Sequence, residues 1–399
     1  MRGALGQIFL SLRNRNFRLF FVGQSISNTG NWLTNVALTL LTLRLTDSGE
    51  AVGLLAACQY GPILLLSVWG GAIADRYDKR RLLFATQSLE MLQSIGLAVL
   101  AFLPRPPLAG LFALAVAGGM LLSLDNPLRR SFVTEMVRPE DIPNAVVLYS
   151  MIVNLSRIAG PALAGLLITT LGYGWCFAVD AATYLAVLLC LALMRASELR
   201  RPPRQAPGER DIRAGFQYLK SLPALWITFG MLAGIGTLAY NFNVTLPLFV
   251  TQALHGSDSE FTVIYSVLSA GGLICGLFVA RRGIVTLRQV LYGAAIFGIA
   301  MLAFSAAPDV AIAVPISFLL GAASIFYTTT TTAIVQVTAR PDMHGRLLAL
   351  QTVLLVGSSA FGGPISGWLA DAFGARSLMV IGGAVCLLAA GAGLTAALT

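Results

Sequence analysis

Residues 71–81 read Gly-Ala-Ile-Ala-Asp-Arg-Tyr-Asp-Lys-Arg-Arg, a short and strongly basic turn between two long apolar stretches. The stretches 51–73 and 82–103 are each long enough to cross the hydrocarbon core of a bilayer, which takes about 20 residues of helix. A basic turn of this kind is typical of the cytoplasmic end of a membrane hairpin, because Lys and Arg are enriched in cytoplasmic loops. The rest of the chain repeats this alternation of apolar runs and short polar turns.

The composition places the whole chain in the membrane class. Of its 399 residues, 56% are hydrophobic and 11% are charged, whereas soluble proteins carry about 25% charged residues. These charges are too few to cover a soluble fold, so a soluble enzyme is excluded. The net charge of +9 lies in short clusters between apolar runs, which indicates membrane orientation and not nucleic-acid binding. Five scattered Cys and two His offer no ligand spacing, so we expect no metal site.

The apolar runs predict twelve transmembrane helices. Their ranges are 17–43, 51–73, 82–103, 108–130, 142–170, 175–194, 223–252, 261–280, 287–307, 310–336, 347–370 and 377–398. With the N-terminus in the cytoplasm, only Arg44, Arg105 and Arg376 of the 27 basic residues fall on the outer side, and Arg157 lies inside a span. This asymmetry supports both the number of spans and a cytoplasmic position for both termini.

The longest polar stretch divides the chain into three parts. Residues 1–194 form a first six-helix bundle, residues 195–222 form a cytoplasmic linker, and residues 223–399 form a second six-helix bundle. In the linker, Ile212, Phe216 and Leu219 recur at helical spacing, which predicts an amphipathic helix on the membrane surface.

The two halves resemble each other in sequence. Arg138-Pro139-Glu140 recurs 202 residues later as Arg340-Pro341-Asp342, and Gly160-Pro161 recurs 203 residues later as Gly363-Pro364. We therefore predict an all-α integral membrane protein with twelve transmembrane helices in two pseudo-symmetric six-helix bundles.

The turn at 71–81 resembles the loop between spans two and three of the major facilitator superfamily. The resemblance implies the fold of that superfamily and a latch that fastens the two halves on the cytoplasmic side. The latch residues that it implies are Gly71, Asp75, Arg76, Arg80 and Glu135.

Within this latch, Arg76 and Arg80 are expected to pair with Glu135. Asp78 stands where the family has Gly, and a cluster of cations at this turn also satisfies the positive-inside rule alone. The similar string 367–376 falls on the outer side by the span count, so we assign it no latch role.

Span five resembles the superfamily motif that is associated with antiporters. Gly160-Pro161 is kept, and Ser156 and Ala164 replace two glycines with other small residues. Small residues permit close helix contact and Pro bends a helix, so packing alone accounts for most of this pattern. The helix-packing residues that we assign in the two halves are Gly160, Pro161, Gly363 and Pro364.

Ionisable groups inside spans are costly and are candidates for function. We assign proton coupling to Asp125, Arg157 and Glu90, and Asp180 is a further candidate in span six. Asp125 and Arg157 lie at similar depths, so we expect them to pair directly or through Asn126 or Asn154, either as a coupling pair or as a permanent structural one. Arg129 and Arg130 are expected to be anchors at the cytoplasmic surface.

Spans one, four, seven and ten should line a central cavity if the resemblance holds. Polar side chains on one face of span one, together with amides and aromatic residues elsewhere, suit a large amphipathic ligand, although Asn and Thr in membrane helices also serve helix contacts. The substrate-binding residues that we assign are Gln24, Asn28, Asn31, Trp32, Asn35, Asn126, Asn154, Tyr240, Asn241, Asn243, Tyr327, Thr328 and Thr331.

Within this superfamily, the chain resembles the enterobactin-exporter-like and macrolide-efflux-like group. The resemblance lies in Asn16-Phe17-Arg18-Leu19, in the turn at 71–81, in residues 157–161 and in His344-Gly345-Arg346.

This resemblance implies a transporter of the bacterial inner membrane, and we expect it to act as a monomer. It would export a small amphipathic molecule, a siderophore or a drug, by proton antiport and alternating access, with no cofactor and no catalytic residues. A lipid transporter or flippase of the same fold, acting for example on lysophospholipid, is the alternative, and coupling to sodium is left open.

Overall fold

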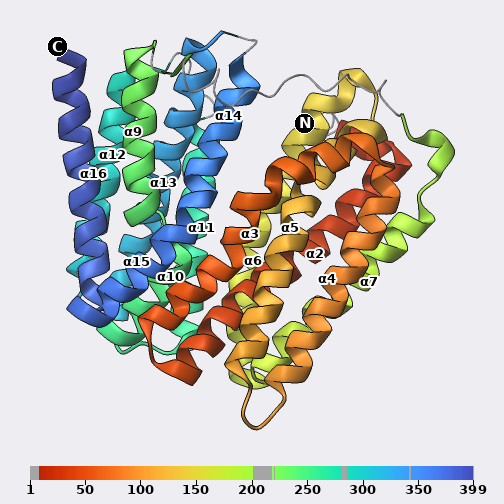
Figure 1. Cartoon of the computed structure of the whole chain (residues 1–399), viewed down its shortest axis with the longest axis horizontal. Helices are drawn as coiled ribbons and strands as arrows, with labels where there is room; N and C mark the ends of the chain where they lie inside the picture. The colour runs from red at the N-terminus through yellow and green to blue at the C-terminus, as the bar shows by residue number, and fades with distance from the viewer. Residues whose placement is uncertain (1–8, 201–217, 220, 280–284, 341–342, 399) are drawn as a thin grey trace, which may run out of the picture. The chain divides into compact units, whose positions relative to one another are not determined.

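Long helices make up nearly all of the part of the chain that the structure describes (Figure 1). The computed structural model describes residues 9–200, 218–219, 221–279, 285–340 and 343–398, without the side chains at 68, 71, 72, 74, 75, 345, 349, 397 and 398. Most of the linker at 195–222, including Ile212 and Phe216 of the expected amphipathic helix, lies outside the described residues. The prediction of an all-α membrane protein is confirmed.

The helices of the first half follow the expected spans closely. A short 3-10 turn, η1 (Leu10–Arg13), precedes them and another, η2 (Pro139–Asp141), lies before α6. The long helices are α2 (Arg15–Thr46), α3 (Gly49–Arg76), α4 (Lys79–Ala101), α5 (Leu108–Met136), α6 (Ile142–Thr170) and α7 (Tyr173–Leu193).

The second half contains two helices that change geometry along their length. Span seven consists of α9 (Pro223–Leu238), α10 (Phe242–Leu248) and the π-helical segment η4 (Phe249–Ala253), and span eleven of α14 (His344–Thr352), the π-helical segment η6 (Val353–Gly357) and α15 (Ser358–Phe373). The others are α11 (Asp258–Val279), α12 (Leu287–Ser305), α13 (Val310–Thr338) and α16 (Ala375–Leu398). Local π segments in a helix often mark functional regions.

Eleven helices in the described part of the chain are long and apolar enough to cross a membrane. The remaining long helix, α2, has 32 residues but does not belong to this set. Its amides, at positions 24, 28, 31 and 35, lower the hydropathy of its middle. With α2, the helices match the twelve spans expected from the sequence.

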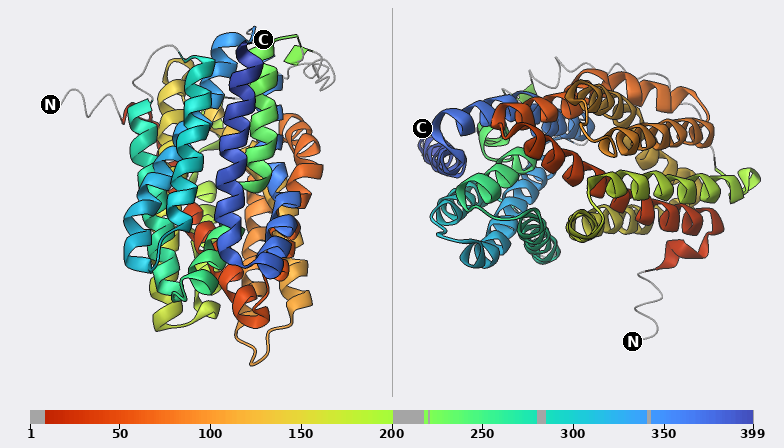
Figure 2. Two further views of the ribbon diagram at one scale, coloured as in Figure 1. Left: turned by 90° about the vertical axis from the view of Figure 1, so that its left-hand side faces the viewer. Right: turned by 90° about the horizontal axis from the view of Figure 1, so that it is seen from below.

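The chain folds into two compact units. The first contains residues 1–41 and 62–206, and the second contains residues 42–61 and 207–399. The second unit thus includes the hairpin where α2 ends and α3 begins. Figure 2 shows the helices of each unit running side by side.

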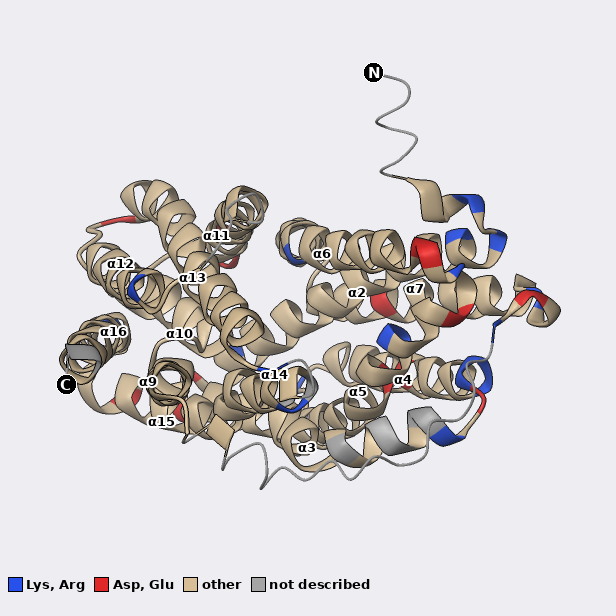
Figure 3. Ribbon diagram, turned by 90° about the horizontal axis from the view of Figure 1, so that it is seen from above, with Lys and Arg blue, Asp and Glu red and all other residues tan. Residues whose placement is uncertain are grey.

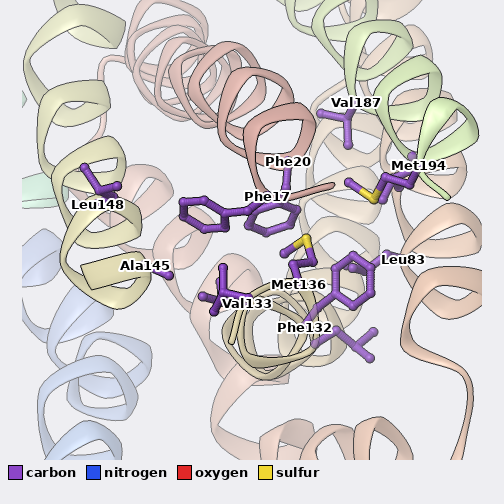
Figure 4. Packing of buried hydrophobic residues seen from close by; sticks show 13 residues of the cluster. Phe17, Phe20, Leu83, Phe132, Val133, Met136, Ala145, Leu148, Val187 and Met194 are labelled. Atoms are coloured by element: carbon purple, nitrogen blue, oxygen red, sulfur yellow. The ribbon is translucent and has the colours of Figure 1, made fainter. Parts of the chain in front are cut away.

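A cluster of apolar side chains closes one end of the first unit (Figure 4). Phe17 and Phe20 of α2 meet Phe132 and Met136 of α5, and each of these four side chains is at most 4% exposed. Burial of large apolar side chains in close contact fixes these helices by packing. This packing gives the first unit a rigid frame for the polar groups deeper inside it.

Candidate functional site

Arg129 lies at the centre of a buried ion network in the first unit. Its side chain is 2% exposed, and its Nη2 lies 3.2 Å from Oε2 of Glu90 on α4. It also pairs with Asp125, one helical turn earlier on α5, as the (i, i+4) spacing favours. Figure 3 shows acidic and basic segments among α2, α4, α5 and α7.

The network corrects two expectations from the sequence. Arg129 is not a surface anchor, because it points into the unit and pairs with two carboxylates, whereas its neighbour Arg130 is exposed. Asp125 pairs with Arg129 and not with Arg157. Similar depth and opposite charge suggested Arg157 as a partner, but Asp125 pairs with a cation one turn away on its own helix.

Arg157 instead lies against an aromatic ring. Its guanidinium carbon is 5.3 Å from the centre of the Trp32 ring on α2, a cation–π contact. Gly160, one turn further along α6, allows this approach, because a Cβ there would meet the Cβ of Trp32. Asn126 is exposed and Asn154 donates to the carbonyl of Ser150 at 2.8 Å, so neither bridges Asp125 to Arg157.

Two polar residues of α4 complete the network, and sequence reasoning missed both. Gln87 Nε2 donates to Oε2 of Glu90 and to Oδ1 of Asp125, each at 2.8 Å. Thr86 Oγ1 donates to the same Oδ1 of Asp125 at 2.9 Å. The sequence pattern that could have identified them is a Thr-Gln pair one turn before an intramembrane Glu. This spacing places polar side chains next to that Glu on one helix.

Asp180 of α7 lies in a separate shell of hydroxyl groups. Its Oδ2 accepts hydrogen bonds from Thr34 of α2 and from Ser94 of α4, both at 2.7 Å. Thr183 donates to its Oδ1 at 3.4 Å. Gly30 of α2 makes room for this shell, because a Cβ there would overlap the carboxylate and the Thr183 hydroxyl.

Gln24, Asn28, Asn31 and Asn35 form a stripe of amide side chains along α2. Part of this amide stripe makes contacts within the first unit. Gln24 is 1% exposed, and Asn28 donates to its carbonyl at 2.8 Å and to its Oε1 at 3.1 Å. Asn31 accepts a hydrogen bond from the Tyr184 hydroxyl of α7 at 2.8 Å. Asn35, like Asn31 and Trp32, is partly exposed. Binding of a substrate by this stripe stays a prediction.

The polar residues that we assigned in span seven lie at the break between α9 and α10. Asn241 directly precedes α10 and is 3% exposed, while Tyr240 packs edge-on against Phe297. The Asn243 amide donates to the Tyr60 hydroxyl, and its Oδ1 accepts from Tyr265 at 2.9 Å. The break therefore positions amide groups against tyrosines inside the second unit.

The assigned residues of α13 differ in exposure. Tyr327 and Thr331 are fully buried, and Tyr327 stacks on Phe297 with ring centres 6.4 Å apart. Thr328 is partly exposed and donates to the Ser324 carbonyl at 3.1 Å. Tyr327 and Thr331 thus contact protein, and contact with a substrate stays a prediction for all three.

In the turn between α3 and α4, Glu135 pairs with a different cation from those expected. Lys79, not Arg80, pairs with Glu135 at 2.8 Å, and both side chains are almost buried. Arg80 donates to the carbonyls of Leu191 (2.9 Å) and Ala192 (3.1 Å) at the end of α7. The side chains of Gly71 and Asp75 lie outside the described residues, and Arg76 is exposed.

Asp78 explains the departure of this turn from the family pattern. Its carboxylate accepts from the backbone amide of Arg81 at 3.0 Å and caps the first turn of α4. A side-chain cap satisfies one of the free amides at a helix start.

The string 367–376, to which we assigned no role, contains a helix cap within the second unit. The Asp371 carboxylate accepts from the amides of Gly49 (2.7 Å) and Glu50 (2.9 Å) and from the Ser48 hydroxyl (2.9 Å) at the start of α3. One and two turns earlier on α15, Gly367 and Gly363 lie against the backbone of Gly49 and Gly53. The signal for this contact was the spacing of Gly363, Gly367 and Asp371 on one helix face.

No group of three His, Cys, Asp or Glu in the described part of the chain is arranged to hold a metal ion.

Comparison with known proteins assigns the family. The transmembrane secretion effector family matches residues 7–399. A staphyloferrin A transporter of Staphylococcus aureus is 28% identical over 294 residues, which cover 71% of this chain and 73% of that protein. The enterobactin exporter EntS of Shigella boydii is 27% identical over 261 residues, or 65% of this chain and 62% of that protein's length.

Solved structures agree with this fold. A bacterial homologue of the human lysosomal transporter Spinster, inward-facing and unoccupied, has a TM-score of 0.76 at 16% identity, covering 96% of this chain and 97% of that one. The POT family transporter PepTSo has a TM-score of 0.77 at 12% identity, covering 96% and 98%. At these identities the likeness concerns the fold alone. The chain is therefore a multi-pass membrane protein that belongs to the transmembrane secretion effector family of the major facilitator superfamily, a family of transporters and not of enzymes.

Proposed function

We propose that this protein exports a small amphipathic molecule of the siderophore type from the cytoplasm by proton antiport. The observation that carries the proposal is the network of Glu90, Asp125 and Arg129, each at most 4% exposed within helices that span the membrane. Charged groups are expensive in a bilayer and are kept there for transport and proton transfer. The siderophore class follows from the names of the relatives, a staphyloferrin A transporter and an enterobactin exporter.

The network has the parts that proton coupling needs. Arg129 pairs with Glu90 and Asp125, and a change in helix packing that moves Arg129 would change the affinity of the buried carboxyls of this unit for a proton. Proton binding would then depend on the conformation of the bundle, which is the link that antiport requires. Arg157 is a further coupling candidate, which the transport assay below also tests.

The cargo would bind where polar and aromatic groups of neighbouring helices meet. Arg157 over Trp32, next to Asn28 and Asn31 on α2, presents a cation, an indole face and amides. This combination suits an oxygen-rich or aromatic molecule with negative charge.

The remaining parts of the proposal concern topology and mechanism. We expect the functional unit to be a single chain in the cytoplasmic membrane, with both termini in the cytoplasm and no cofactor. Cargo release would follow alternating access by the two helical bundles.

Transport by the purified chain in proteoliposomes tests this function. Enterobactin, staphyloferrin A, a macrolide and a fluorescent lysophospholipid serve as separate probes, each under an imposed pH gradient and under a sodium gradient alone. We expect transport of a siderophore that the pH gradient accelerates. Movement of lysophospholipid alone would instead support a lipid transporter, and acceleration by sodium alone would exclude proton antiport.

Two Asp→Asn variants serve as the test and its matched control. Asp125→Asn should abolish the acceleration by the pH gradient, because it breaks the ion pair that holds Arg129 in place among the buried carboxyls. Asp309→Asn alters an exposed cap of α13 and should leave the acceleration intact.

A further inference from the structure

The buried part of the first unit contains more acidic groups than basic ones. Glu90, Asp125 and Asp180 are each at most 4% exposed, and Arg129 pairs with the first two. Asp180 has no Lys, Arg or His nitrogen within salt-bridge distance among the residues that the structure describes. If all three carboxyls were ionised, the unit would hold uncompensated negative charge away from water, which is costly. Bound protons remove this charge.

A second observation also indicates that the network is short of a hydrogen-bond donor. Gln87 is fully buried, and its Oε1 has no donor in the described part of the chain, although its Nε2 has two acceptors. An unpaired amide oxygen is unfavourable in a dry interior.

The surroundings of the three carboxyls differ in a way that distinguishes their roles. Glu90 and Asp125 face the guanidinium of Arg129 and the amide nitrogen of Gln87, which can only donate, although Asp125 also meets the Thr86 hydroxyl. These donors favour the ionised carboxylate. Asp180 meets hydroxyl groups, which can donate to a carboxylate or accept from a carboxylic acid by rotating one hydrogen.

We propose that Asp180 is the carboxyl that takes up and releases the exchanged proton, an assignment that rests on the proton antiport proposed above. The step is the transfer of one proton between water and Oδ2 of Asp180, in which one O–H bond forms or breaks and no electrons are exchanged. Thr34 and Ser94, each 2.7 Å from that oxygen, accommodate both forms without movement of heavy atoms.

The position of Asp180 also connects the proton to α2, the helix that carries the predicted cargo stripe. Thr34, which donates to Asp180, lies three residues after Asn31 on α2. Asn31 in turn accepts from Tyr184, which lies one turn after Asp180 on α7. A shift of α2 during transport would break the Thr34 contact and so alter the affinity of Asp180 for its proton.

The charged and titratable groups around Asp180 come from three helices. Its own helix, α7, contributes Tyr184, and α4 and α5 contribute the other ionisable residues. These are Glu90, Asp125 and Arg129. The groups that α2 contributes are uncharged.

Infrared difference spectroscopy of the purified full chain, without any cargo, tests the assignment. We expect a buried carboxylic-acid band that appears when the buffer is changed from alkaline to acidic. The band should disappear in Asp180→Asn and persist in Glu90→Gln and Asp125→Asn. Loss of the band in Glu90→Gln or Asp125→Asn with its retention in Asp180→Asn would overturn the proposal.

If Asp180→Asn does not fold, variants of Thr34 in the hydroxyl shell test the same assignment by infrared spectroscopy. Thr34→Val should shift the pH midpoint of the band, and Thr34→Ser, which keeps a hydroxyl, should restore it. A midpoint that is the same in wild type and Thr34→Val would contradict a proton on Asp180.

A transport assay distinguishes failure of the Asp180 assignment from failure of the proposed proton antiport. With enterobactin and staphyloferrin A as probes, Asp180→Asn should keep exchange of labelled for unlabelled cargo but lose the acceleration by a pH gradient. If Asp180→Asn is still accelerated like the wild type, the assignment of Asp180 fails and proton antiport stands. If the wild type itself is not accelerated, proton antiport fails, and the infrared band alone decides whether Asp180 titrates.

Discussion

At the scale of single residues, the position of a charge along a helix decides its partner. Arg129 and Arg130 are adjacent in sequence, yet Arg129 is buried with two carboxylates and Arg130 is exposed. One residue step turns a side chain by about 100° around a helix of 3.6 residues per turn. Neighbouring cations can therefore belong to the interior and to the surface.

Replacement of Arg129 tests the importance of the network. Arg129→Met leaves two carboxylates buried without their cation, which should lower the free energy of unfolding by about 3–5 kcal/mol. Arg130→Met is the matched control and should unfold at the wild-type temperature. Both are measured by thermal unfolding in detergent. A melting temperature for Arg129→Met that equals that of Arg130→Met would show that the ion network does not stabilise the fold.

At the scale of helices, the second unit depends on glycines that bring backbones together. Gly363 and Gly367 of α15 lie against the backbone of the first turns of α3, and Asp371 follows one turn later as the cap. Small residues at a helix contact allow the close packing on which membrane proteins depend. One face of α15 thus combines close packing with a hydrogen-bonding cap.

Two Gly→Ala substitutions distinguish the effect of helix packing on stability from the effect of helix propensity. In Gly367→Ala the new methyl group would overlap the Gly49 carbonyl oxygen, so we expect a loss of about 1–3 kcal/mol of stability. Gly391→Ala, in α16, meets open space and should gain about 0.5–1 kcal/mol from higher helix propensity. Thermal unfolding of the two variants should move in opposite directions. Equal changes would contradict the close contact at Gly367.

Hydrogen exchange tests the cap on α3. Asp371→Ala removes the acceptor of the Gly49 and Glu50 amides, and loss of such a cap costs about 0.5–2 kcal/mol. Amide exchange should become faster in the first turn of α3. Asp309→Ala, which removes the cap of α13, should change exchange only at the start of α13. Unchanged exchange at Gly49 and Glu50 in Asp371→Ala would exclude the cap.

The elements were more predictable than the contacts between them. Hydropathy located the helices because a membrane imposes their length, and only the interruptions at α9–α10 and at η6 had no clear pattern in the sequence. The pairing of Asp125 was predicted wrongly, because depth along two helices does not say which faces meet. The cap by Asp371 was missed because it joins segments more than 300 residues apart.

At the scale of the whole molecule, the sequence repeat has a structural counterpart. Gly172, between α6 and α7, and Gly374, between α15 and α16, both have positive φ, at 95° and 82°. They are 202 residues apart, the offset at which the Arg-Pro-acid motif recurs. Turns with the same left-handed backbone thus end corresponding helices in the two halves, as expected for a duplicated bundle.

Labelling of introduced cysteines tests the proposed topology. With all five native Cys replaced, a cysteine at Tyr77 and one at Glu198 should react only with reagent from the cytoplasmic side, and one at Asp47 only from the outside. The alternation of basic turns gives this expectation. Reaction of the Tyr77 and Glu198 positions from opposite sides would contradict the twelve-span arrangement.

Movement of protons against the cargo is the central claim, and it can be measured directly. Proteoliposomes that contain the purified chain and a pH-sensitive dye are given a gradient of siderophore with no initial pH difference. The account predicts that movement of the siderophore in one direction drives protons in the other, and that Asp125→Asn abolishes this proton movement. Transport of the siderophore with no change in internal pH would contradict it.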